Sequence, residues 1–218
     1  MSYFNKRIKF IVFYGIICFF GSVFAGSYED FFSALERDDA PAVAQLIRLG
    51  FDPNTPSPQG LHPLFAAINA PAPKVANALA QAPATKFDLR NAHEETPLMM
   101  ASIKGMDVLA KLLIDRGSDV NKTAWTPLHY AASTGQLVVM NLLLDRHAYI
   151  DAPSPNGTTP LMMAAMYGTP SAVKLLLEAG ADPTIKNDLN LTAVDFALRE
   201  NKRESASLIE AFLRAKSK

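Results

Sequence analysis

The chain has 218 residues, of which 49% are hydrophobic and 9% aromatic, which is enough apolar material for a folded domain. It carries 21 basic and 21 acidic residues, so its formal net charge is zero. This balance gives no sign of the basic stripe that nucleic-acid-binding proteins use, and the sequence predicts no nucleic-acid partner.

The first 25 residues have the three parts of a secretory signal peptide. A basic head over residues 5–9 precedes an apolar run over residues 10–20, and Val23 and Ala25 stand where a signal peptidase requires small residues. This pattern predicts cleavage after Ala25 and a periplasmic or secreted protein. The alternative is an uncleaved anchor in the inner membrane, because residues 8–25 are just long enough to span a bilayer.

Cleavage would change both the charge and the cysteine content of the protein. Three basic residues and no acidic residue are removed, which leaves 18 basic against 21 acidic residues and a net charge of −3. Cys18 is the only cysteine, and Ile16 and Ile17 before it do not fit a lipoprotein signal. A mature chain from Gly26 therefore has no cysteine and tolerates an oxidising compartment without disulfides.

A short motif recurs along the rest of the chain. Its clearest copy is Thr-Pro-Leu-His-Tyr-Ala-Ala over residues 126–132, and close copies begin at Thr96 and Thr159. Weaker copies begin at His62 and Thr192. The second residues of the five copies, at positions 63, 97, 127, 160 and 193, are 34, 30, 33 and 33 residues apart. A period near 33 with this motif resembles the ankyrin repeat.

Each residue of the motif has a mechanical role in a helix-turn-helix unit. Thr126 is placed to cap a helix, and Pro127 follows at the first helical position, where its missing N–H costs nothing. Leu128 and Ala131 share one helical face, and Gly135 allows the left-handed turn into a second, apolar helix. One such unit cannot bury its apolar face alone, so several must stack.

The resemblance implies an all-α repeat fold for residues 26–218, an ankyrin solenoid of about six helix-turn-helix repeats joined by β-hairpin fingers. The expected repeats are about 28–58, 59–90, 91–121, 122–152, 153–185 and 186–218. The second is the most divergent internal repeat, and we expect local distortion there. The spacing of 30 predicts a blunted finger, about three residues short, between the third and fourth repeats.

No arrangement of residues in the sequence indicates catalysis or a cofactor, and we expect no enzyme activity. The resemblance implies that His129 hydrogen-bonds near the preceding threonine and braces the turn, and that His62 replaces a capping threonine. The pairs at 99–100 and 162–163 are methionines, which bind Cu(I) in some proteins. They occupy motif positions, however, so the sequence favours packing between repeats over a metal site.

The resemblance also implies a protein partner, bound on the concave face formed by the finger tips and the exposed side of the first helices. The membrane is a partner only if the N-terminal segment is not cleaved. The predicted contact residues lie just before each motif or just before the turn between the helices: Gln59, Leu61, His93, Glu95, Ile103, Lys104, Lys122, Trp125, Ser133, Thr134, Asn156, Thr158, Met166, Tyr167 and Arg199.

Two of these positions carry large aromatic side chains. Tyr167 is expected to be a contact, whereas Trp125 is equally compatible with a contact and with packing along its finger. The function that follows is a non-enzymatic protein-binding module in the periplasm. The alternatives are a secreted effector that binds a host protein and an accessory factor that protects a periplasmic enzyme such as catalase.

Overall fold

The computed structural model describes residues 26–70 and 72–216, so the predicted signal peptide, residues 1–25, lies outside the described residues. The described residues form two compact units, which divide between Thr85 and Lys86. All regular secondary structure in the described residues is helical. No helix among them is both long enough and apolar enough to cross a membrane.

The first unit contains two helix pairs. A helix over residues 26–36 is followed by α2 (Ala40–Arg48), and α3 (Pro63–Asn69) by α4 (Pro73–Gln81). The α4 helix packs against both α2 and α3. His62 caps α3, because its Nδ1 accepts a hydrogen bond from the backbone N–H of Leu64 at 3.2 Å, which confirms the predicted replacement of the capping threonine.

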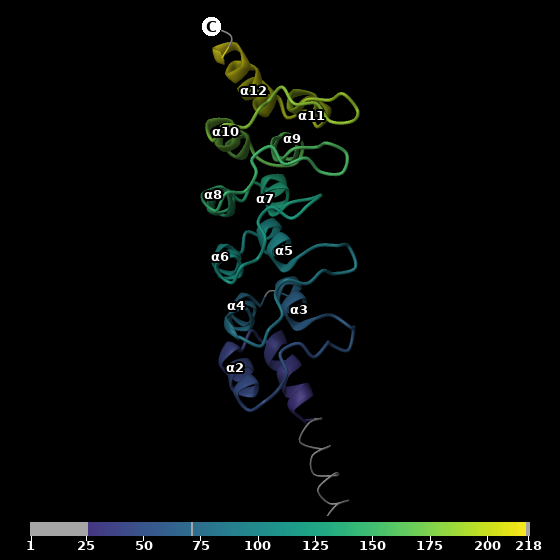
Figure 1. Cartoon of the computed structure of the whole chain (residues 1–218), viewed down its shortest axis with the longest axis vertical. Coiled ribbons are helices and arrows are strands. Elements are labelled where there is room, and N and C mark those ends of the chain that lie inside the picture. Colours follow the sequence, from purple (N-terminus) through teal and green to yellow (C-terminus); the bar gives the residue numbers. More distant parts are fainter. Residues whose placement is uncertain (1–25, 71, 217–218) are drawn as a thin grey trace, which may run out of the picture. The chain divides into compact units, whose positions relative to one another are not determined.

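The second unit repeats one arrangement. Its helices are α5 (Pro97–Ile103), α6 (Asp107–Asp115), α7 (Pro127–Thr134), α8 (Leu137–Asp145), α9 (Pro160–Met166), α10 (Pro170–Glu178), α11 (Ala193–Arg199) and α12 (Arg203–Lys216). The first helices α5, α7, α9 and α11 each pack on the next, and α6, α8, α10 and α12 form a second row (Figure 1). The loops project beside the first row.

The motif forms the helix starts that the sequence predicts. The hydroxyl of Thr96 accepts a hydrogen bond from the N–H of Met99 at 3.2 Å, and Thr159 does the same for Met162 at 3.3 Å. The helix ends also follow the prediction. After the last residue of α7, Gly135 adopts a φ of 71°, in the left-handed region that only glycine enters without strain. These local signals fix the length of the first helices at about two turns.

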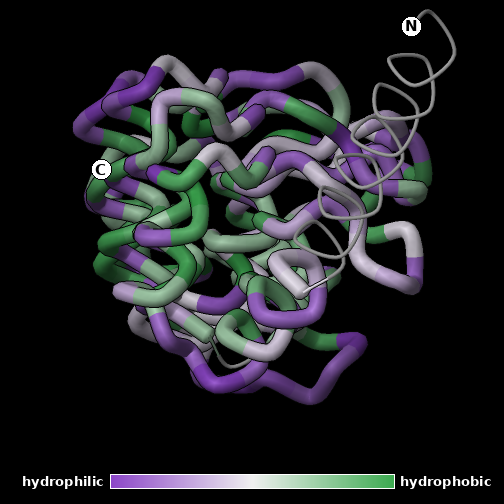
Figure 2. Tube along the Cα trace, turned by 90° about the horizontal axis from the view of Figure 1, so that it is seen from below, coloured by the Kyte–Doolittle hydropathy of each residue, from purple (hydrophilic) through white to green (hydrophobic). Residues whose placement is uncertain are grey.

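The core of the second unit is built from the same positions in successive repeats. Leu113, Leu143 and Leu176 occupy equivalent places in α6, α8 and α10, and all three are fully buried. Small residues allow close approach: a Cβ on Gly168 would lie 2.3 Å from the carbonyl oxygen of Ala132. Most hydrophobic positions lie on the helices, whereas the outer loops are mostly hydrophilic (Figure 2).

The loops beside the first helices contain no regular strand among the described residues, so β-hairpin fingers are not confirmed. Four of these loops end in a turn closed by a backbone hydrogen bond from residue i to residue i+4. These pairs are Ser57 and Leu61, Asn91 and Glu95, Ser154 and Thr158, and Asn187 and Leu191. The loop at residues 122–125 is shorter, as the spacing predicts, and its chain turns with Ala124 at a φ of 76°.

The boundary between the two units falls within the second predicted repeat, residues 59–90. Its helix α4 ends at Gln81, and the next residue, Ala82, is extended with a ψ of 122°, instead of the left-handed turn that a glycine would allow. Pro71, at the position where the third, fourth and fifth repeats have glycine, lies outside the described residues.

Candidate protein-binding surface

A buried imidazole lies at the centre of the candidate site. The Nε2 of His129 lies 2.9 Å from the carbonyl oxygen of Thr158, and its Nδ1 accepts from the N–H of Thr126 at 3.1 Å. The Thr126 hydroxyl also lies 2.9 Å from Nδ1. Nε2 therefore carries the proton, and the ring joins the start of α7 to the next loop. This confirms the role predicted for His129.

Burial makes this imidazole a weak base. His129 is fully buried, and this burial lowers the pKa of its ring to about 4, although the hydrogen bond to Thr158 opposes the shift. At neutral pH the ring is uncharged. It is therefore a structural hydrogen-bonding group and does not supply positive charge to the surface above it.

Methionine takes the place of this histidine in two neighbouring repeats. The sulfur of Met99 accepts a hydrogen bond from the N–H of Thr96 at 3.4 Å, and Met162 does the same for Thr159. Both side chains are buried, as predicted for packing between repeats. Within the described residues there is no cluster of three or more histidine, cysteine, aspartate or glutamate side chains arranged to hold a metal ion.

An apolar cavity of about 230 Å³ lies between the first helices α5, α7 and α9. Its lining residues are Ile103, Trp125, His129, Tyr130, Ser133 and Met163. Three of them, Ile103, Trp125 and Ser133, belong to the predicted contact set. We call this space the aromatic pocket.

Trp125 is both packed and accessible. Its ring meets the His129 ring edge-on, with 5.3 Å between centroids, so one part of the indole packs on the start of α7. The side chain is half-buried and borders two cavities. The predicted packing role is therefore present, and the part of the indole that is not packed stays accessible.

A second cavity of about 200 Å³ lies beside the shortened loop. Its lining residues are Arg90, His93, Glu94, Met99, Lys122, Thr123, Ala124, Trp125 and Tyr130. We call it the notch. Four other loops have a turn from residue i to i+4 at this place, whereas the loop that borders the notch is about three residues shorter. The sequence predicted the short loop but not the cavity that it opens.

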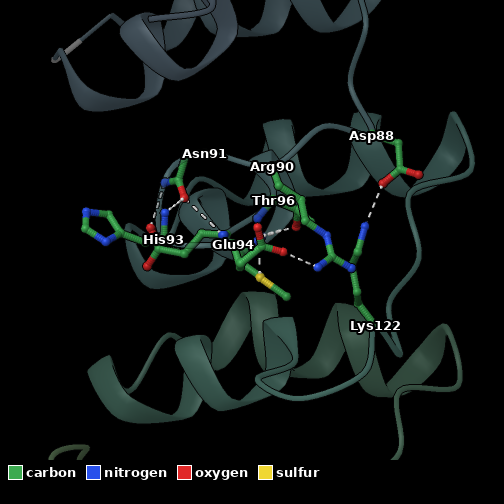
Figure 3. A network of polar contacts seen from close by, with 9 residues as sticks. Asp88, Arg90, Asn91, His93, Glu94, Thr96 and Lys122 are labelled. Atoms are coloured by element: carbon green, nitrogen blue, oxygen red, sulfur yellow. Dashed lines mark hydrogen bonds and ion pairs between the residues drawn. The ribbon is translucent and has the colours of Figure 1, made fainter.

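The charges around the notch are largely paired, as Figure 3 shows. Arg90 forms an ion pair with Glu94, and the Nζ of Lys122 lies 3.3 Å from a carboxylate oxygen of Asp88. The imidazole of His93 points away from Arg90 and Lys122. The two cations beside the notch are therefore each neutralised by a nearby carboxylate.

Glu95 links the turn at residues 91–95 to Tyr130, which lines the aromatic pocket. Its carboxylate accepts hydrogen bonds from the Asn91 amide at 2.8 Å and from the Tyr130 hydroxyl at 3.2 Å. Burial of the phenol, together with the smaller effect of the negative charge of Glu95, raises the pKa of Tyr130 to about 12. The phenol stays protonated and donates to the Glu95 carboxylate, which therefore lies next to a residue that lines the pocket.

The other predicted contacts are spread over both units. His93, Lys104, Thr134, Asn156, Tyr167 and Arg199 are exposed, Lys122 and Met166 are half-buried, and Tyr167 retains 55% of its accessible surface. Thr134 donates a hydrogen bond to the carbonyl oxygen of Ile103. Gln59 and Leu61 are exposed and belong to the first unit.

Thr158 is not available as a contact, contrary to its prediction. It is 2% exposed, its N–H donates to the Ser154 hydroxyl at 3.0 Å, and its carbonyl receives the His129 ring. The backbone of Thr158 is therefore held between the Ser154 hydroxyl and the ring of His129 from the preceding repeat. The prediction considered only its place in the sequence.

Tyr130 and Met163 line the aromatic pocket but were missing from the predicted set. Tyr130 lies three and four residues before Ser133 and Thr134 on α7, so it shares their helical face. Met163 has the equivalent place on α9, four residues before Tyr167. Extending the predicted positions back by one helical turn would have found both.

Comparison with known proteins agrees with the stacked helix pairs. The family described as ankyrin repeats (3 copies) matches residues 31–124, 72–154, 109–187 and 147–211. The rat ankyrin repeat and SAM domain-containing protein 6 is 41% identical over 83 residues, which are 38% of this chain and 9% of that protein. A putative E3 ubiquitin-protein ligase of Arabidopsis thaliana, XBAT31, is 36% identical over 100 residues. This match covers 42% of the chain and 22% of the ligase, so the chain spans a small part of such relatives.

Two solved structures are similar over most of the chain. The human ASB11 ankyrin repeat domain has a TM-score of 0.74 and 26% identity, over 84% of this chain and 82% of that one. A chain in the complex of the predatory endopeptidase Bd0816 from Bdellovibrio bacteriovorus with immunity protein Bd3460 has a TM-score of 0.70 and 25% identity. That match covers 84% of this chain and 97% of the other. The protein belongs to the ankyrin-repeat family.

Proposed function

We propose that the chain is an exported, non-enzymatic protein-binding module that acts in the periplasm as a solenoid of about six ankyrin repeats. Ankyrin repeats generally mediate protein–protein interaction. The observation that carries the proposal is the aromatic pocket beside the notch, where half-buried Trp125 and Tyr130 border a cavity of about 230 Å³. Partly buried aromatic side chains in a concave site commonly contribute most of the binding energy of an interface.

The export part of the proposal rests on the signal-peptide pattern of residues 1–25. Removal of this segment after Ala25 would leave a chain without cysteine, which suits the oxidising periplasm. A secreted effector that binds a host protein would use the same surface. The two differ only in where the partner is found.

A second candidate function is protection or restraint of an exported enzyme, the accessory role predicted from the sequence. It is favoured by the likeness to a chain from the complex between a predatory endopeptidase and its immunity protein. In that complex, one of the two proteins has the fold of this chain over 97% of its length. The partner of this chain would then be an exported enzyme.

Affinity capture with residues 26–218 as bait tests the proposal. We expect a protein from periplasmic extract of the source organism to be retained by the unmodified bait and lost with a bait carrying Trp125→Ala and Tyr167→Ala. Cytoplasmic extract should yield no such protein. Equal capture by both baits would mean that the partner binds away from Trp125 and Tyr167. Capture only from host extract would favour the secreted effector.

A further inference from the structure

The aromatic pocket has the size and the lining of a site for one large apolar side chain. A cavity of about 150 Å³ with an apolar lining accommodates a benzene ring. The pocket has about 230 Å³ and is lined by the side chains of Ile103, Trp125, Tyr130 and Met163 around a neutral imidazole. An aromatic or long aliphatic side chain therefore fits, whereas a charged group would lose its hydration there.

A carboxylate that no cation neutralises contacts the hydroxyl of Tyr130, which lines the pocket. Arg90 and Lys122 already pair with Glu94 and Asp88, and these four charges cancel. In the described part of the chain, Glu95 has no ion-pair partner, and its hydrogen-bond donors, Asn91 and Tyr130, are neutral. Beside Tyr130, the charge that no ion pair balances is therefore the carboxylate of Glu95.

Together these observations define the chemistry of the occupant. We propose that the pocket receives an aromatic or large aliphatic side chain of the partner protein, and that Glu95 selects a lysine or arginine beside it. This inference rests on the proposed function and specifies the partner segment: an apolar anchor followed or preceded by a cation. The Tyr130 hydroxyl positions the Glu95 carboxylate for that cation.

The chain contains a single tryptophan, and it lines the pocket, so its fluorescence reports occupancy directly. Three blocked dipeptides serve as probes: N-acetyl-Phe-Lys-amide, N-acetyl-Phe-Glu-amide and N-acetyl-Ala-Lys-amide. We expect Phe-Lys to change the fluorescence with half-saturation at about 1 mM, a weak but measurable affinity. Phe-Glu should bind at least about tenfold more weakly, and Ala-Lys should give no saturable change up to about 10 mM.

Glu95→Gln is the matched variant, because the amide removes the charge at nearly constant size and keeps one of the two oxygens that accept from Tyr130 and Asn91. In this variant the affinities for Phe-Lys and Phe-Glu should differ by less than about twofold, and Phe-Lys should still bind. High salt should also reduce the difference in affinity between the two peptides. Equal binding of the two peptides by the unmodified chain would overturn the role of Glu95. If none of the three peptides changes the fluorescence, the proposal that the pocket binds an apolar side chain is refuted.

The peptide titration and the affinity capture fail independently. Capture that depends on Trp125, without any peptide response, would leave the proposed function standing and refute this inference. A selective peptide response without a captured periplasmic protein would retain the pocket and reject the periplasmic partner.

Discussion

Leu143→Ala is expected to lower the free energy of unfolding by about 2–5 kcal/mol. The side chain is fully buried in α8, which packs against α6, α7 and α10, so truncation leaves a cavity that three neighbouring helices border. Neighbouring repeats hold leucine at the same position, so local collapse would disturb the stacking on both sides. Denaturant unfolding followed by the fluorescence of Trp125 measures the loss in this part of the chain.

Val138→Ala in the same helix is the matched control. Val138 is 65% exposed, so its truncation should change the free energy of unfolding by less than about 0.5 kcal/mol. An equal effect of the two substitutions would show that the buried face of α8 is assigned wrongly.

Stability should fall as the pH drops from about 7 to 5, because of His129. The folded protein has a His129 pKa of about 4, below the 6.5 of an unperturbed histidine, so the unfolded chain binds more protons in this range. The neutral His129 ring makes its full contribution to the free energy of unfolding above about pH 6.5, and this contribution is lost as the pH falls toward 4. The full shift corresponds to about 3 kcal/mol, and the part between pH 7 and 5 to about 2 kcal/mol.

His129→Met isolates this contribution, because Met99 and Met162 occupy the same place in neighbouring repeats. The variant should be less stable at pH 7, by about 1–3 kcal/mol, since the carbonyl of Thr158 loses its donor. The difference between the two proteins should shrink by about 2 kcal/mol at pH 5. A difference that stays constant between pH 7 and 5 would refute the neutral, buried imidazole.

The sequence predicts the local parts of the fold well, because short-range signals determine them. Capping by Thr96, the turn at Gly135 and the apolar runs of the second helices all lie within one helix or one turn. The period of the motif then places equivalent residues such as Leu113 and Leu143 in one core. These features depend on residue type and spacing alone.

The candidate site was only partly predictable, because its key contacts join residues far apart in the sequence. The Tyr130 hydroxyl meets Glu95 across 35 positions, and His129 reaches Thr158 across 29. Both contacts depend on how successive loops lie over the first helices. The short loop at residues 122–125 was evident from the spacing, but the cavity that it leaves depends on side chains from the preceding turn.

The central claim is that the surface around Trp125 binds a protein partner. Titration calorimetry of the captured partner against the full mature chain, Trp125→Ala and Val108→Ala tests it most directly. We predict that loss of the indole weakens binding by about 2 kcal/mol or more, roughly 30-fold in Kd. Val108 on α6 is 55% exposed and lines neither cavity, so its variant should bind within about twofold of the unmodified chain. Equal affinity of all three proteins, with Trp125→Ala still folded, would contradict the account.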